Sequence, residues 1–233
     1  MLYYIKDLWL FIHKPSPTIY DSNKTVKERV LSVFIYYLWE IIFLFPVIAA
    51  LAVLNYYGLL PENSNKLNTK TDFFENLFLI CLAVPFVEEI IFRSHLASPR
   101  WSIVACLVSI VCGMLFVFEI IIVNFNSKLP ILVSIFLISV SSFLFSDQFL
   151  RNFYKRYYFV IFYSIAFAFS LIHLTNFDYK KTPFILFPVL LTAQFLGGIF
   201  LGFIRLKYGF FYCVLSHFWF NFTLLVAKYI DNI

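Results

Sequence analysis

Phe86-Val87-Glu88-Glu89-Ile90-Ile91-Phe92-Arg93 places two adjacent carboxylates and an arginine inside an apolar run long enough to cross a bilayer. An acid at the centre of a membrane helix costs roughly 2.5–3.5 kcal/mol on insertion scales, so this pair needs shelter and partners. Glu89 and Arg93 are four residues apart and therefore share a helix face within ion-pair reach. Glu88 points about 100° away from that face. We expect a functional site here.

Pro85 comes just before the two acids and has no backbone N–H to donate to the carbonyl of Cys81. The helix is therefore expected to be opened or bent at this point. Irregular backbone and polar chemistry are tolerated at membrane depth where they line a cavity. The sequence thus predicts a cavity beside the acids.

The composition is that of a membrane protein that crosses the bilayer several times. Of its 233 residues, 62% are hydrophobic, 22% are aromatic and only 13% are charged, and the mean hydropathy is +0.85. The formal charge of +5 does not indicate nucleic-acid binding, because the Lys and Arg residues fall mostly in short connections between apolar runs. The predicted fold is all-α, a polytopic transmembrane helical bundle whose surroundings are the lipid bilayer.

Apolar runs predict about seven spans after an interfacial amino-terminal arm, residues 1–30. The spans cover about residues 31–56, 72–96, 101–123, 130–145, a fifth run from after Arg156 to about 175, 183–204 and 210–229. In the sixth, Gly198 and Gly202 form a face of small residues that permits close helix contact. No internal repeat and no second domain are found.

The orientation follows from the Lys and Arg residues that flank the spans. With Arg93 set aside as a site residue, eleven lie on the side of the amino terminus and six on the other side. The excess predicts a cytoplasmic amino terminus and an external carboxyl terminus. We expect an integral protein of a bacterial cytoplasmic membrane.

Two further apolar stretches carry hydrogen-bonding side chains. His173 ends the fifth span, and His217 lies in the seventh on the same helix face as Asn221. A carboxylate in a low-dielectric pocket can serve as general base toward water near neutral pH, and imidazole can help to orient that water. A second imidazole and an amide nitrogen can donate hydrogen bonds to the oxyanion of an attacked carbonyl. Together with Glu88, these groups predict a hydrolase.

The ordered motifs Glu-Glu-x-x-x-Arg at 88–93, Phe-x-x-x-His at 169–173 and His-x-x-x-Asn at 217–221 resemble those of one family. It is the CPBP family of CAAX-protease and bacteriocin-processing intramembrane endopeptidases, also called Abi and related to the type II CAAX prenyl endopeptidases. The resemblance covers roughly residues 73–229, so residues 73–233 would be the protease core, after a first span and loop at 31–72.

The resemblance implies roles at the matching positions. Glu88 would activate water together with His173, His217 and Asn221 would form the oxyanion site, and Glu89 with Arg93 would hold the geometry. The substrate would be a membrane-associated protein or peptide, either prenylated and CAAX-type or a peptide precursor. No cofactor is expected. The alternative is Zn²⁺ on Glu88, His173 and His217.

The chain departs from the family pattern in one respect. About eighty residues separate Glu89 from His173 where members commonly have a few tens, and the excess matches two helices inserted at about 101–148. These helices could cap the cavity, gate substrate entry or pack outside.

Depth in the membrane gives an internal check. At ~1.5 Å per residue, Glu88 and His217 lie roughly 12 Å from the cytoplasmic ends of their helices. His173 would lie near 24 Å if its span began at Tyr158. The site closes if that span starts nearer Phe162 or tilts, and we expect one of the two.

Other buried polar residues allow simpler explanations. Glu40, Glu119 and Gln194 could each make an interhelical hydrogen bond or face a cavity, and Asp147 is expected at an interface. The cysteines show no metal-like or paired spacing and are expected to be small core residues: Cys81, Cys106, Cys112 and Cys213. Two other functions stay open, a catalytically silent immunity or binding protein and a proton-coupled transporter. The transporter reading predicts inverted repeats, which are not seen.

Overall fold

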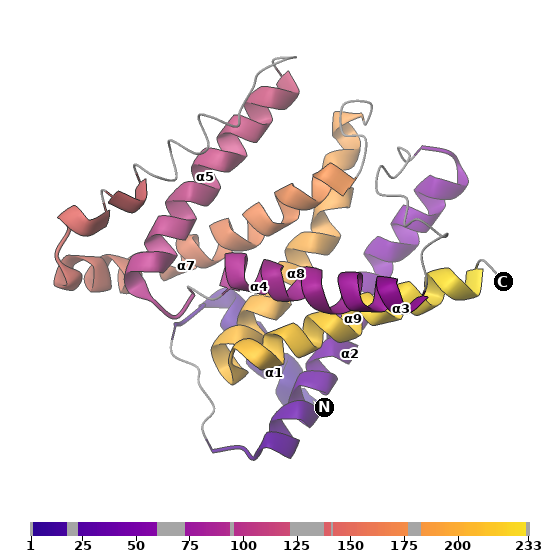
Figure 1. The fold of residues 1–233 in the computed structure, drawn as a ribbon, viewed down its shortest axis with the longest axis horizontal. Helices are drawn as coiled ribbons and strands as arrows, with labels where there is room; N and C mark the ends of the chain where they lie inside the picture. The colour runs from indigo at the N-terminus through magenta and orange to yellow at the C-terminus, as the bar shows by residue number, and fades with distance from the viewer. Residues whose placement is uncertain are drawn as a thin grey trace.

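The computed structural model describes residues 2–17, 23–59, 73–93, 96–121, 138–140, 142–176 and 183–231. Within these ranges the regular elements are all helical, as predicted (Figure 1). The helices are α1 Leu2–His13, α2 Val26–Tyr56, α3 Phe73–Asn76, α4 Val84–Arg93, α5 Pro99–Ile121, α7 Asp147–Ile172, α8 Phe187–Tyr208 and α9 Phe210–Asp231. A π-helical segment, η1 Leu77–Ala83, joins α3 to α4, and short 3₁₀ turns lie at Ser142–Leu144, His173–Asn176 and Phe184–Leu186.

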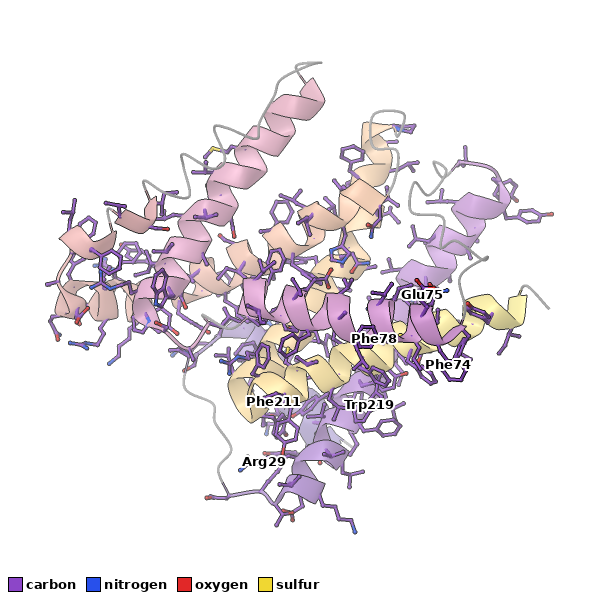
Figure 2. The ribbon with its side chains drawn as sticks, viewed as in Figure 1. Arg29, Phe74, Glu75, Phe78, Phe211 and Trp219 are labelled. Atoms are coloured by element: carbon purple, nitrogen blue, oxygen red, sulfur yellow. The ribbon has the colours of Figure 1, made fainter. Side chains whose placement is uncertain are left out.

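Within the described ranges, four helices are long and apolar enough to cross a membrane: Val26–Leu54, Asp147–Ile172, Phe187–Tyr208 and Phe210–Ala227. The continuous helical run from α3 to α4 and the apolar α5 correspond to the predicted second and third spans. The fourth, at about 130–145, lies mostly outside the described residues. Phe74, Phe78 and Phe211 are exposed on the outside of the bundle (Figure 2), as lipid-facing side chains should be. The protein is an integral membrane protein of the polytopic helical class.

The amino-terminal arm packs against the bundle. Leu8 and Phe11 of α1 are buried in the main core, and the Phe11 ring contacts Phe162 and Phe203. Asp7 accepts hydrogen bonds from Lys207 and from Tyr36, so α1 is tied to α8 and α2. The sequence predicted an interfacial segment but not this docking.

The first membrane helix starts earlier than its predicted boundary at residue 31. Thr25 and Glu28 form a reciprocal capping box, in which the Thr25 N–H donates to the Glu28 carboxylate and the Glu28 N–H to the Thr25 hydroxyl. Helix α2 therefore begins at Val26, and it continues through Pro46 to Tyr56. Residues 26–30 belong to α2 and not to the arm.

Helix α5, the described part of the inserted segment, packs mainly on α7 at the edge of the bundle (Figure 1). Arg100 pairs with Asp147 at 2.7 Å where the two helices begin. Asp147 is an exposed residue in the first turn of α7, and its place at an interface stays a prediction. Helix α7 then changes direction at Tyr157, whose backbone is not helical.

Helix α8 is the most enclosed of these four long helices. Its two predicted small residues do allow close contact with α7. A Cβ at Gly198 would lie 3.3 Å from the Ala166 carbonyl oxygen, and a Cβ at Gly202 would lie 2.7 Å from the Phe162 ring. Gly209 ends the helix with φ 104°, a left-handed value that favours glycine.

We predict that Gly202→Ala lowers the free energy of unfolding by about 1–3 kcal/mol, because the buried Phe162 ring would have to move. Gly197→Ala is the matched control, since its Cβ meets only an ordinary contact at 3.4 Å. Thermal unfolding in one detergent measures both. Equal stability of the two variants would contradict the close contact.

Candidate active site

The backbone before the acids is irregular, as Pro85 predicted. In η1 the N–H of Val84 bonds to the carbonyl of Leu79 instead of that of Ile80. The next residue that could serve the Ile80 carbonyl is Pro85, which has no N–H. That carbonyl instead accepts a hydrogen bond of 2.9 Å from Nδ2 of Asn221. The π-helical turn therefore fixes a predicted site residue of α9 against η1.

Glu89 is a fully buried carboxylate that connects three side chains. Its Oε1 accepts from Arg93 at 3.0 Å and from Nδ1 of His217 at 2.8 Å, and its Oε2 lies 2.8 Å from the Cys213 thiol. The predicted Glu89–Arg93 ion pair is confirmed. Glu89 also bonds two groups of α9, so it joins the helix of the acids to the helix of His217.

Arg93 is enclosed to the same degree as its partner, with 1% of its side chain exposed. Its guanidinium lies 3.8 Å from the centre of the Phe169 ring, close enough for a cation–π interaction. Arg205 of α8 donates a 3.2 Å hydrogen bond to the Arg93 carbonyl. The end of α4 is thereby held against both α7 and α8.

Glu88 faces two imidazoles. Its carboxylate oxygens lie 3.8 Å from Nε2 of His173 and 3.5 Å from Nε2 of His217. In each ring Nδ1 is already engaged, with the Phe169 carbonyl for His173 at 2.7 Å and with Glu89 for His217. Because both of these acceptors lack a proton, each Nδ1 is the donor and each Nε2 is left for the space beside Glu88.

His173 therefore reaches the depth of Glu88, as the estimate from helix lengths required. His173 lies within 4 Å of Glu88. It stands in the 3₁₀ turn that follows α7, beyond the change of direction at Tyr157.

A cavity of about 610 Å³ opens beside these groups. Glu88 is partly exposed in it, with 21% of its side chain accessible, whereas Glu89 is fully covered. The described lining residues come from α2, η1, α4, the end of α7, the 3₁₀ turn after it, α8 and α9; those with polar side chains are Glu40, Glu88, His173, Asn176, Gln194, His217 and Asn221.

The structure thus brings together Glu88, His173, His217 and Asn221 around the cavity and places Glu89 and Arg93 directly behind them. No described residue of α5 lines the cavity, so this part of the insertion packs outside, on α7. Glu119 belongs to α5. Sequence reasoning missed the contact of Cys213 with Glu89, although Cys213 lies one helical turn before His217.

A bound metal was the alternative for Glu88, His173 and His217. Both Nε2 atoms face the carboxylate, and each Nδ1 has the acceptor that a metal-binding imidazole needs. Among the described residues, however, no three His, Cys, Asp or Glu side chains are gathered closely enough to hold a metal ion. The zinc alternative stays a prediction.

A helical membrane bundle with a carboxylate, two imidazoles and an amide around an internal cavity has the parts of an intramembrane hydrolase. A family model described as type II CAAX prenyl endopeptidase Rce1-like matches residues 70–223. The chain belongs to this family of CAAX-type membrane proteases. No curated protein and no solved structure matches the chain. The family resemblance inferred from the motifs is confirmed.

We predict that Glu89→Gln destabilises the protein by about 3–5 kcal/mol, because it leaves the buried Arg93 cation without its counter-ion. The double variant Glu89→Gln/Arg93→Met should recover much of the loss, because no charge is then left unpaired. Thermal unfolding of wild type, single and double variants in the same detergent gives the comparison. Additive losses would show that the two side chains are not coupled.

Proposed function

We propose that this protein is an intramembrane endopeptidase that hydrolyses a peptide bond of a membrane-associated protein or peptide. The observation that carries the proposal is the convergence of Glu88, His173 and His217 on one cavity from three separate helical segments. The substrate class is a prenylated CAAX-type protein or a peptide precursor, held near the site by the membrane itself.

Glu88 and His173 are proposed to activate the attacking water. Their facing atoms are 3.8 Å apart, too far for a direct hydrogen bond, and such a gap suits a bridging water. Glu88 takes a proton as the water oxygen attacks the carbonyl carbon. The same proton then passes to the amine nitrogen as the carbon–nitrogen bond breaks.

His217 and Asn221 are proposed to stabilise the oxyanion. Glu89 accepts from Nδ1 of His217 and fixes the ring so that Nε2 faces the cavity, where an Nε2–H would donate to the oxyanion. Asn221 uses one Nδ2 hydrogen on the Ile80 carbonyl and keeps the other. Glu89 and Arg93 are positioning residues because neither side chain reaches the cavity.

The orientation remains a proposal from the distribution of Lys and Arg. A cytoplasmic amino terminus places the site nearer the cytoplasmic face, and the bond cut would lie at that depth.

We expect Glu88→Gln to lower cleavage at least ~100-fold, because it removes the general base. Peptide mass spectrometry would compare membranes from cells that make wild type or Glu88→Gln. The matched control is Glu75→Gln, a carboxylate on the exposed face of α3 (Figure 2). Identical peptides from wild type and Glu88→Gln would favour the silent immunity or binding protein.

We also predict that activity survives removal of metal ions, in line with a water activated by Glu88. The purified protein is dialysed against a zinc chelator and assayed on a substrate found by the mass spectrometry. Loss of activity that added Zn²⁺ restores would instead support zinc on Glu88, His173 and His217.

A further inference from the structure

A third carboxylate, Glu40, lines the same cavity from α2. It has 1% of its surface exposed and lies in a helix outside the range that the family model matches. Neither the sequence motifs nor the proposed reaction uses it. It faces the space shared by Glu88, His173 and His217.

One oxygen of the Glu40 carboxyl has no direct partner. Its Oε2 is buried and has no hydrogen-bond partner, and no ion pair involves its carboxylate within the described parts of the chain. Isolated carboxylates are expensive to bury unless they are paired and hydrogen-bonded. Because this one borders the cavity, the missing partner can come from a bound molecule.

The ionisable residues around the cavity indicate the charge of the molecule that could bind to Glu40. Of the described lining residues the ionisable ones are Glu40, Glu88, His173 and His217, and none is Lys or Arg. The nearby Arg93 is already paired with Glu89. Two carboxyl groups in one low-dielectric cavity favour a bound cation over a bound anion, because a cation stabilises their ionised form.

Helix α8 leaves room beside the Glu40 carboxyl. A Cβ at Gly197 would lie 3.4 Å from its Oε1, and beyond the adjoining backbone no other described heavy atom lies within 4 Å of that position. Gln194, almost one turn earlier on α8, also lines the cavity, and its amide carbonyl can accept a hydrogen bond from an ammonium or guanidinium group.

We propose that Glu40 forms a substrate subsite that binds a Lys or Arg side chain of the peptide whose bond lies at Glu88. The inference deepens the proposed function and rests on it for the cavity being the place where substrate binds. Glu40 is then a specificity-determining residue. The ammonium or guanidinium supplies the hydrogen bonds that its Oε2 lacks.

The test measures binding separately from turnover. The protein carries Glu88→Gln and is held in lipid nanodiscs. The probes are acetylated, amidated hexapeptides of Ser and Leu with a single Lys at successive positions, and norleucine replaces Lys in each reference peptide. At one position Lys should raise affinity about tenfold over norleucine. Adding Glu40→Gln should abolish that preference, whereas adding Glu75→Gln should preserve it.

A second variant keeps the carboxylate. Gly197→Ala puts a methyl group beside Glu40 and should weaken Lys binding while norleucine binding stays the same. Gly197→Ala therefore still tests the Lys subsite if the Glu40→Gln variant does not fold. Equal affinity for Lys and norleucine at all positions, or a Lys preference that survives Glu40→Gln, would overturn the subsite.

Turnover of the same peptides by protein with Glu88 intact separates the two proposals. Cleavage that lacks any Lys preference contradicts the subsite and leaves the protease. A Glu40-dependent Lys preference without cleavage contradicts the protease and leaves a cation-binding cavity.

Discussion

The ion pair between Glu89 and Arg93 is the interaction on which the site depends. Both side chains are removed from solvent, where an unpaired charge would be strongly destabilising. Glu89 also bonds His217 and Cys213 on α9, and Arg93 lies against Phe169 on α7. One short helix is thus tied by charge to two neighbours, and Glu88 is turned from that cluster towards the cavity.

Pro85 shows how an irregular backbone becomes part of a site. A proline inside a membrane helix removes a hydrogen bond that water cannot replace in lipid. Here the π-helical turn moves the unsatisfied carbonyl to Ile80, and Asn221 of α9 bonds to it. The irregular backbone thereby positions the Asn221 amide beside the cavity and ties η1 to α9.

Much of the site was accessible from sequence because its physical rules are local. A four-residue spacing is enough to place Glu89 beside Arg93, and a proline is enough to predict the opened helix. Composition alone requires a membrane bundle. The start of α2 was missed because the predicted boundary followed the apolar run, whereas the Thr25–Glu28 capping box lies in the polar stretch before it. The docking of α1 was missed because it depends on Asp7 meeting Lys207, far away in sequence.

The sequence by itself determined the class of protein, the order of its motifs and the pairing of charges within one helix, since all of these follow from composition and helical periodicity. Only the tertiary structure decided that α5 packs outside and that Cys213 touches Glu89. It also decided that Glu40 borders the cavity. The physical reason is that contacts between helices depend on crossing angles and on kinks such as that at Tyr157, which no spacing along the chain encodes.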